Sequence, residues 1–214
     1  MKKRVLLVLL GFVLCATSAW ATPINLEFLR VDPGTTVQIH IGGFYDGGAL
    51  AGSYVNRIGG VDTFTYCIDI LHYAPAKGQP FTYDLREFLN TDDISLVRAA
   101  WIMSQYLPLA NAKENVIAQV AIWEIVSGST AGNLGLGDFT VQDWGGSGLA
   151  AAQILVNAAL NITSFDTSNF KLASNEYTQD FLVYSPVPEP ATMLLLGTGL
   201  IGLAGFGRKK LFKK

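Results

Sequence analysis

The chain has 214 residues, half of them hydrophobic, and a formal net charge of −2 at pH 7. Three basic residues lie at the N-terminus and five at the C-terminus, which leaves 7 basic against 16 acidic residues between Thr22 and Pro188, a net charge of −9. This acidic stretch lacks the clustered Lys and Arg that nucleic-acid binding requires, so we expect no nucleic-acid partner.

The N-terminus has the pattern of a secretory signal peptide. Lys2-Lys3-Arg4 comes first, an apolar run from Val5 to Leu14 follows, and Ala19-Trp20-Ala21 supplies a cleavage site. The apolar run is shorter than the roughly 20 residues that span a bilayer. We therefore expect signal peptidase to remove residues 1–21, Cys15 included, during export across the inner membrane.

Residues 22–185 have the length of one secreted domain, and their first half indicates β-strands. Alternating or β-branched and aromatic residues predict strands at 24–31, 37–41, 61–70 and 81–85, with a last strand at 181–184. Glycine pairs at 42–43, 47–48 and 59–60 are expected to form turns.

The second half of the domain indicates helices. Periodic apolar residues predict helices at 95–107, 112–127 and 148–160, with a glycine-rich loop at 128–148. Asn111 followed by Glu114 is typical of a capping box at the start of the second helix. The sequence therefore predicts an α+β fold, in which a sandwich- or barrel-like β-rich N-terminal half packs with about three helices.

Two residues of the predicted domain, Gln119 and Cys67, are candidates for a functional role. Between Val116 and Trp123 every residue except Gln119 is apolar, which predicts a buried amide that needs hydrogen-bond partners; a neighbouring backbone group is the simplest one. Cys67 is the only cysteine left after processing, so it has no partner for an internal disulfide. A buried inert thiol, pairing with another chain, a free thiol and another covalent use all stay open.

The segments Tyr66-Cys67-Ile68-Asp69 and Gln119-Val120-Ala121-Ile122-Trp123 together resemble the two signatures of thioester domains, which are known from bacterial surface adhesins. The resemblance implies that the side chains of Cys67 and Gln119 join in an intramolecular thioester, with release of ammonia. It also implies attachment, by attack of an amine on the thioester, to an amine-bearing surface protein or polymer. The supporting motif residues are Tyr66, Asp69, Ile122 and Trp123.

The C-terminus has three parts: Pro188-Glu189-Pro190, an uncharged run from Ala191 to Gly207, and a basic end. By physical properties alone this is a transmembrane anchor with cytoplasmic basic residues. It also resembles the PEP-CTERM sorting signal of Gram-negative bacteria. The resemblance implies that residues 186–214 anchor the protein transiently in the membrane until an exosortase removes them, and that the product reaches the cell surface or the extracellular polysaccharide matrix.

Other chemistries fit the sequence less well. A cysteine hydrolase needs a histidine base, and His72 could reach Cys67 only if the chain bends at Leu71. One cysteine and two scattered histidines give no metal-ligand spacing. We therefore expect no enzyme activity, no catalytic residue, no metal and no cofactor. The main alternative to the thioester is a non-reactive structural or binding protein of the extracellular matrix.

Overall fold

The computed structural model describes residues 22–88, 93–106, 111–127, 132–142, 144–145 and 147–185. The predicted signal peptide and the predicted tail, with Pro188, Glu189 and Pro190, lie outside the described residues. Within the described ranges, no helix has the length and apolar character needed to cross a membrane.

The described strands form one antiparallel sheet in the order β2-β3-β7-β6-β4-β1-β5. Since β1 also pairs with β2, the first six of these strands close into a barrel-like ring, and the short strand β5 pairs with the last residues of β1. The strands are β1 (Thr22–Ile41), β2 (Tyr45–Ile58), β3 (Val61–Cys67), β4 (Pro80–Glu87), β5 (Phe139–Val141), β6 (Phe170–Ser174) and β7 (Phe181–Tyr184).

The long strand β1 makes the closure possible. Its first residues pair with β4, in the register Leu26↔Phe81, while its remaining length pairs with β2. Two register shifts near Phe28 and Val31 interrupt the β1–β2 ladder, and such bulges increase the local twist of a strand. The backbones come very close there, because a Cβ on Gly52 would lie 2.5 Å from the carbonyl oxygen of Pro33.

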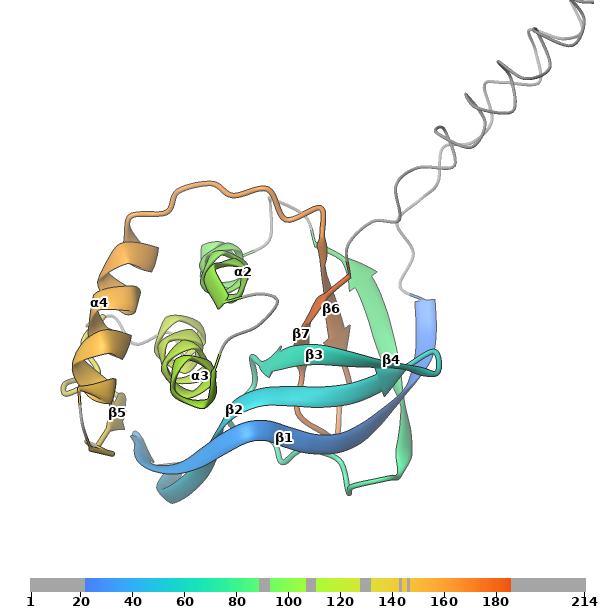
Figure 1. The fold of residues 1–214 in the computed structure, drawn as a ribbon, viewed down its shortest axis with the longest axis horizontal. Coiled ribbons are helices and arrows are strands. Elements are labelled where there is room, and N and C mark those ends of the chain that lie inside the picture. The colour runs from blue at the N-terminus through green and yellow to red at the C-terminus, as the bar shows by residue number, and fades with distance from the viewer. Residues whose placement is uncertain are drawn as a thin grey trace, which may run out of the picture.

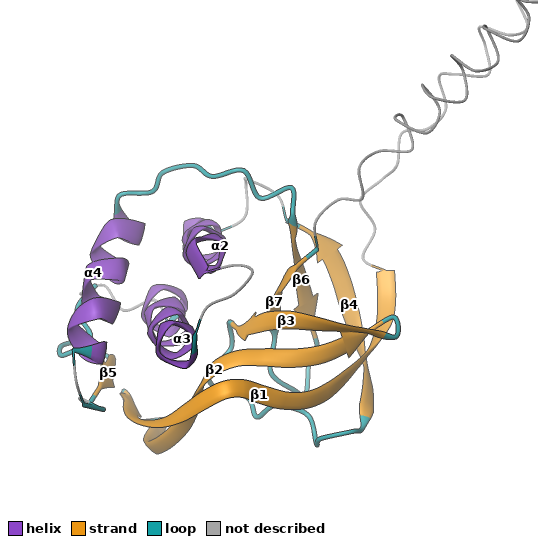
Figure 2. Ribbon diagram, viewed as in Figure 1, coloured by secondary structure: helices purple, strands orange, loops and turns teal. Residues whose placement is uncertain are grey.

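Three described helices, α2 (Ile94–Tyr106), α3 (Ala112–Val126) and α4 (Gly148–Leu160), gather at one side of the sheet (Figures 1 and 2). Helix α3 packs on β1, β2 and β3 and is flanked by α2 and α4. Its start is fixed by the predicted capping box: Glu114 N donates to Asn111 Oδ1 at 3.1 Å, and Asn111 N donates to Glu114 Oε2 at 3.0 Å. The cap fixes where α3 begins, and packing on the strands and on the two neighbouring helices buries its apolar residues.

The structure confirms the α+β class, the barrel-like β-rich half and the predicted helices. Some details were wrong. The two strands predicted at 24–31 and 37–41 are one strand, and Gly47–Gly48 lie inside β2, because pairing with the neighbouring strand overrides the local turn signal. Strand β5 falls within the predicted loop at 128–148, and β6 was not predicted.

Candidate functional site

Cys67 lies at the end of β3, where the chain leaves the sheet for the loop before β4. It is opposite Phe181 of β7, and the following residue, Ile68, donates its N–H to the carbonyl of Asp180 at 3.1 Å. Cys67 is fully buried. The end of β3 is therefore fixed to β7 and to the residue before it, in the interior of the domain.

Gln119 of α3 meets the backbone of Cys67. Cys67 N donates to Gln119 Oε1 at 2.9 Å, and Gln119 Nε2 donates to the Cys67 carbonyl oxygen at 2.8 Å. Gln119 is fully buried, as predicted, and its amide is satisfied by a neighbouring backbone group. The two residues that the sequence motifs single out, 52 positions apart, therefore lie in direct contact.

The thiol of Cys67 has two hydrogen-bond partners. Its Sγ accepts from Trp123 Nε1 at 3.3 Å and donates to the carbonyl oxygen of Asp69 at 3.3 Å. Burial raises the pKa of Cys67 from 9.0 to about 12, although the Trp123 hydrogen bond opposes the rise. At neutral pH the thiol is therefore protonated, and the indole N–H is the group placed to stabilise a thiolate.

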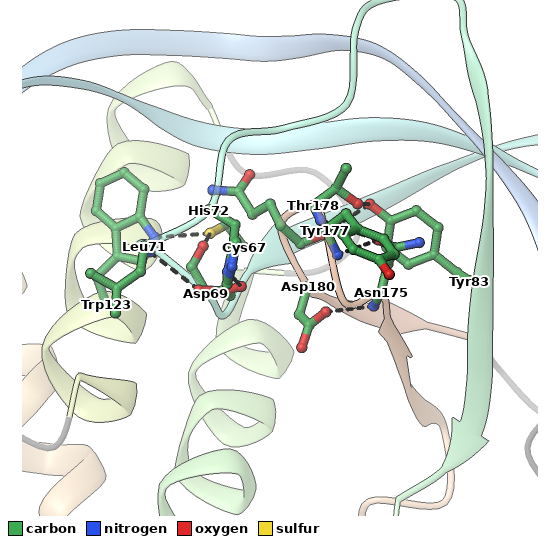
Figure 3. A network of polar contacts seen from close by, with 11 residues as sticks. Cys67, Asp69, Leu71, His72, Tyr83, Trp123, Asn175, Tyr177, Thr178 and Asp180 are labelled. Atoms are coloured by element: carbon green, nitrogen blue, oxygen red, sulfur yellow. Dashed lines mark hydrogen bonds and ion pairs between the residues drawn. The ribbon is translucent and has the colours of Figure 1, made fainter.

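Asp69 orders the loop that follows Cys67, as Figure 3 shows. One carboxylate oxygen accepts from Leu71 N at 3.2 Å, and the other accepts from His72 Nδ1 at 2.6 Å. The chain does bend at Leu71, but it brings His72 to the Asp69 carboxylate. Among the described residues, the hydrogen-bond partners of the Cys67 thiol do not include a histidine.

A second loop, residues 175–180, supports the first (Figure 3). The Tyr83 hydroxyl lies 2.7 Å from Thr178 Oγ1 and donates to the carbonyl of Gln179 at 3.0 Å. Gln179 N in turn donates to the carbonyl of Tyr73 at 3.1 Å. The two loops therefore form one connected wall beside Cys67.

The other motif residues secure α3 against β3. The Tyr66 hydroxyl donates to Asn115 Oδ1 at 2.8 Å, and both residues are buried. Ile122 is fully buried in the core. Asn115 was not predicted, although its spacing gave a signal: Asn115, Gln119 and Trp123 are four residues apart and share the helix face that meets Tyr66 and Cys67.

A cavity of about 480 Å³ adjoins this site. Trp123 forms part of its wall and also contacts the Cys67 thiol, so the indole lies at the boundary between the cavity and the sulfur. The other walls come from the β1–β2 hairpin and the two loops, and include Phe28, Val31, Ile39, Tyr54, Ile70, His72 and Gln179. The sequence did not reveal this cavity because its walls are far apart along the chain.

No metal centre is evident in the part of the chain that the structure describes, where no three His, Cys, Asp or Glu side chains gather to hold an ion. His40 lies 3.9 Å from Asp46 at the exposed end of the β1–β2 hairpin. Each of the two histidines therefore has a carboxylate neighbour, His40 in β1 and His72 in the loop after β3.

Residues 186–209 match the family model of the PEP-CTERM protein-sorting motif. The match confirms the sorting signal recognised in the sequence, and it implies an exported protein that is sorted to the cell surface or the extracellular space. None of the curated proteins matches the sequence.

Among solved structures, the fold is similar to two bacterial proteins. The N-terminal thioester domain of a surface protein from Clostridium perfringens is 15% identical, with a TM-score of 0.43, over 78% of this chain and 100% of that one. The TIE protein of Bacillus anthracis is 10% identical, with a TM-score of 0.41, and the match covers 77% of this chain but 39% of that one. Both likenesses are distant and concern the fold alone.

Proposed function

We propose that this is an exported surface domain that forms a thioester between Cys67 and Gln119 and uses it for covalent attachment to an amine-bearing partner. The observation that carries the proposal is the pair of hydrogen bonds that seats the Gln119 carboxamide on the backbone of Cys67, in a site closed to water. Holding the two reacting groups close together in this way can lower the free-energy barrier to reaction by several kcal/mol, on the order of 7–11 kcal/mol in the best cases.

The polar groups around the amide suit its conversion. The Cys67 N–H that donates to Gln119 Oε1 polarises the carbonyl and remains in place for the oxyanion of a tetrahedral intermediate. In the reaction the sulfur attacks the Gln119 carbonyl carbon, a C–S bond forms, the C–N bond breaks, and the nitrogen leaves as ammonia with the thiol proton. Sγ must give up its hydrogen bond to the Asp69 carbonyl for this step, while Trp123 Nε1 can stay close to the sulfur.

The product is an acyl group that an amine can capture. A neutral amine attacks the same carbon, a C–N bond forms, the C–S bond breaks, and Cys67 receives the proton that the amine loses. Each molecule reacts once, so the domain is a covalent graft and not a turnover catalyst. Processing by an exosortase at the sorting motif would then place this graft at the surface or in the extracellular matrix, with adhesion as the outcome.

A non-reactive matrix protein is the second candidate, and a specific observation favours it. The hydrogen bonds to Cys67 satisfy the buried Gln119 without any reaction, and burial keeps the thiol protonated. In this alternative the Cys67–Gln119 contact only fastens α3 to β3.

The intact mass of the mature domain, purified without exposure to amines, tests the proposal. A thioester makes the domain lighter than its sequence by one ammonia. Methylamine should then add its own mass at residue 119, which leaves the domain heavier than its sequence by one methylene group, and should free the Cys67 thiol. Cys67→Ala and Gln119→Ala should each show the full sequence mass. Peptide mapping distinguishes a thioester that has been hydrolysed, which leaves Glu at position 119, from a Gln119 side chain that never formed a thioester. An intact Gln119 amide together with a free Cys67 thiol would end the thioester proposal.

A further inference from the structure

The cavity beside Trp123 has the features of a recognition site. Its volume of about 480 Å³ lies within the range of ligand pockets, roughly 300–1,000 Å³, and most of its walls are apolar. Its rim carries four exposed apolar side chains: Phe44, Leu50, Leu71 and Tyr73. Of these, Phe44 is 80% exposed and Tyr73 is 84% exposed, and apolar side chains that gather around one cavity, rather than lying scattered singly, are typical of a binding surface.

The cavity and the proposed thioester share one residue. Trp123 lines the cavity with its ring and donates its N–H to the Cys67 sulfur. An amine that arrives through the cavity therefore reaches the indole before it reaches the acyl carbon. Cys67 and Gln119 are themselves fully buried.

We propose that this cavity selects the acceptor by binding a large apolar or aromatic side chain next to the reacting lysine of a partner protein. The inference rests on the proposed function. The cavity offers more space than an alkylammonium group fills, and an aromatic side chain buries about 150–250 Å² in such a site. The acidic character of the domain, with 16 acidic and 7 basic residues between Thr22 and Pro188, favours a cationic partner segment.

Two polar groups in the cavity fit the lysine head. Gln179 is 5% exposed, and its Oε1 has no hydrogen-bond partner among the described residues, so a donor is missing there. His72, whose Nδ1 lies 2.6 Å from Asp69 Oδ2, also lines the cavity. In the step that follows, the lysine amine attacks in its neutral form: its nitrogen bonds to the Gln119 carbonyl carbon, the C–S bond breaks, and one proton passes from the nitrogen to the Cys67 sulfur.

The test compares two acetylated, amidated peptides, Gly-Lys-Gly and Phe-Lys-Gly, with methylamine and glucosamine. Protein whose thioester has been verified by mass should become covalently attached to Phe-Lys-Gly about ten-fold faster than to Gly-Lys-Gly or glucosamine. Ala49 also lines the cavity, and Ala49→Trp, which fills it, should bring the rate for Phe-Lys-Gly down to that for Gly-Lys-Gly. Equal rates for the two peptides, or a glucosamine rate as high as that of Phe-Lys-Gly, would overturn the inference while leaving the thioester intact.

Two exposed tyrosines provide a matched pair that should not affect folding. Tyr73→Ser removes a cavity residue that is 84% exposed, whereas Tyr177→Ser removes a tyrosine that is 78% exposed and does not line the cavity. Only the first should reduce the preference for Phe-Lys-Gly.

The Cys67→Ala variant, which has no thioester, should still bind this peptide, and binding should shift the Trp123 indole N–H signal in NMR spectra. Failure of this peptide to shift the signal in the variant rejects the recognition site, whatever the mass measurement says about the covalent bond.

Discussion

Gln119 and Cys67 are joined by two reciprocal hydrogen bonds, from Cys67 N to Gln119 Oε1 and from Gln119 Nε2 to the Cys67 carbonyl, so that a helix side chain takes the place of a neighbouring strand. A side-chain amide carries a donor and an acceptor side by side, so it can pair with the N–H and the C=O of one residue at the same time. The same arrangement that satisfies the backbone of Cys67 also places the Gln119 carbonyl carbon beside the only cysteine of the domain. Structural support and proposed reactivity therefore depend on the same contact.

The structural part of this contact can be measured apart from the chemistry. In a Cys67→Ala background no thioester forms, but the backbone N–H and C=O of residue 67 remain. Adding Gln119→Leu should lower the free energy of unfolding by about 1–3 kcal/mol, since two buried backbone groups lose their partners. Urea denaturation gives this difference. Gln105→Leu, at an exposed position of α2, is the control and should change stability by less than about 0.5 kcal/mol.

Trp123 is predicted to control the rate at which the thioester opens. Its Nε1 lies 3.3 Å from Cys67 Sγ, so its N–H should stabilise the thiolate that leaves when an amine attacks. Trp123→Phe keeps most of the packing and removes this donor, so methylamine should open the thioester about ten-fold more slowly, as expected for the loss of one hydrogen bond to a developing charge. The rate is read from mass spectra over time.

Trp101→Phe, a partly buried tryptophan on α2, serves as the control for that experiment. It should leave the opening rate unchanged. A Trp123→Phe domain that reacts as fast as the wild type would show that the indole N–H plays no part in the departure of sulfur.

The sequence predicted those parts of the site that local signals determine. The Asn111–Glu114 capping box and the apolar run around Gln119 are patterns within one helix, and both the helix and the burial of Gln119 are confirmed. The closure of the sheet was not predictable in the same way. It depends on β1 pairing with both β2 and β4, and those contacts follow from long-range packing that no short window of sequence contains.

The same limit applies to the residues around the site. The spacing of Asn115 before Gln119 was visible in the sequence, but its partner Tyr66 lies 49 positions away. The loop at 175–180 has no motif of its own, and only the structure places Gln179 beside Trp123 in one cavity. Residues that act through tertiary contacts of this kind carry no local signature.

The Tyr66–Asn115 hydrogen bond should fasten the start of α3 to β3. Tyr66→Phe should cost about 1 kcal/mol of stability, and Asn115→Ala about 1–3 kcal/mol, because the second change leaves the buried Tyr66 hydroxyl without this acceptor. A double-mutant cycle by urea denaturation should give a coupling energy of at least about 0.5 kcal/mol. Additive effects would mean that the two side chains do not depend on each other.

The raised pKa of Cys67 predicts both low reactivity and a dependence of stability on pH. In Gln119→Met, where no thioester can form, the shift from 9.0 to about 12 reduces the thiolate fraction near pH 8 by about 10³, so iodoacetamide should alkylate the folded protein correspondingly slowly. Unfolding in urea should restore an ordinary rate.

The sign of the pH effect follows from the direction of the same shift. Between pH 9 and about 12 the folded state keeps the thiol proton that the unfolded state loses. The stabilisation is therefore complete below pH 9 and is lost as the pH rises through this window. Comparing Gln119→Met with Cys67→Ala plus Gln119→Met across that range isolates the contribution of Cys67. Parallel stability curves for the two proteins would contradict the raised pKa.

The sorting motif predicts how the chain is processed. Replacing Pro188, Glu189 and Pro190 with alanine, within the matched residues 186–209, should leave the tail attached and the protein in the membrane fraction. The reason is that the changes remove the recognition sequence but keep the uncharged run from Ala191 to Gly207 and its basic end, which together suit a membrane anchor. Fractionation of the producing cells and mass spectrometry of the C-terminal peptide give the location and the cleavage state.

Ser185→Ala, just outside the matched residues, is the control and should be processed like the wild type. Normal trimming and release of the triple alanine variant would show that the Pro-Glu-Pro segment does not direct processing.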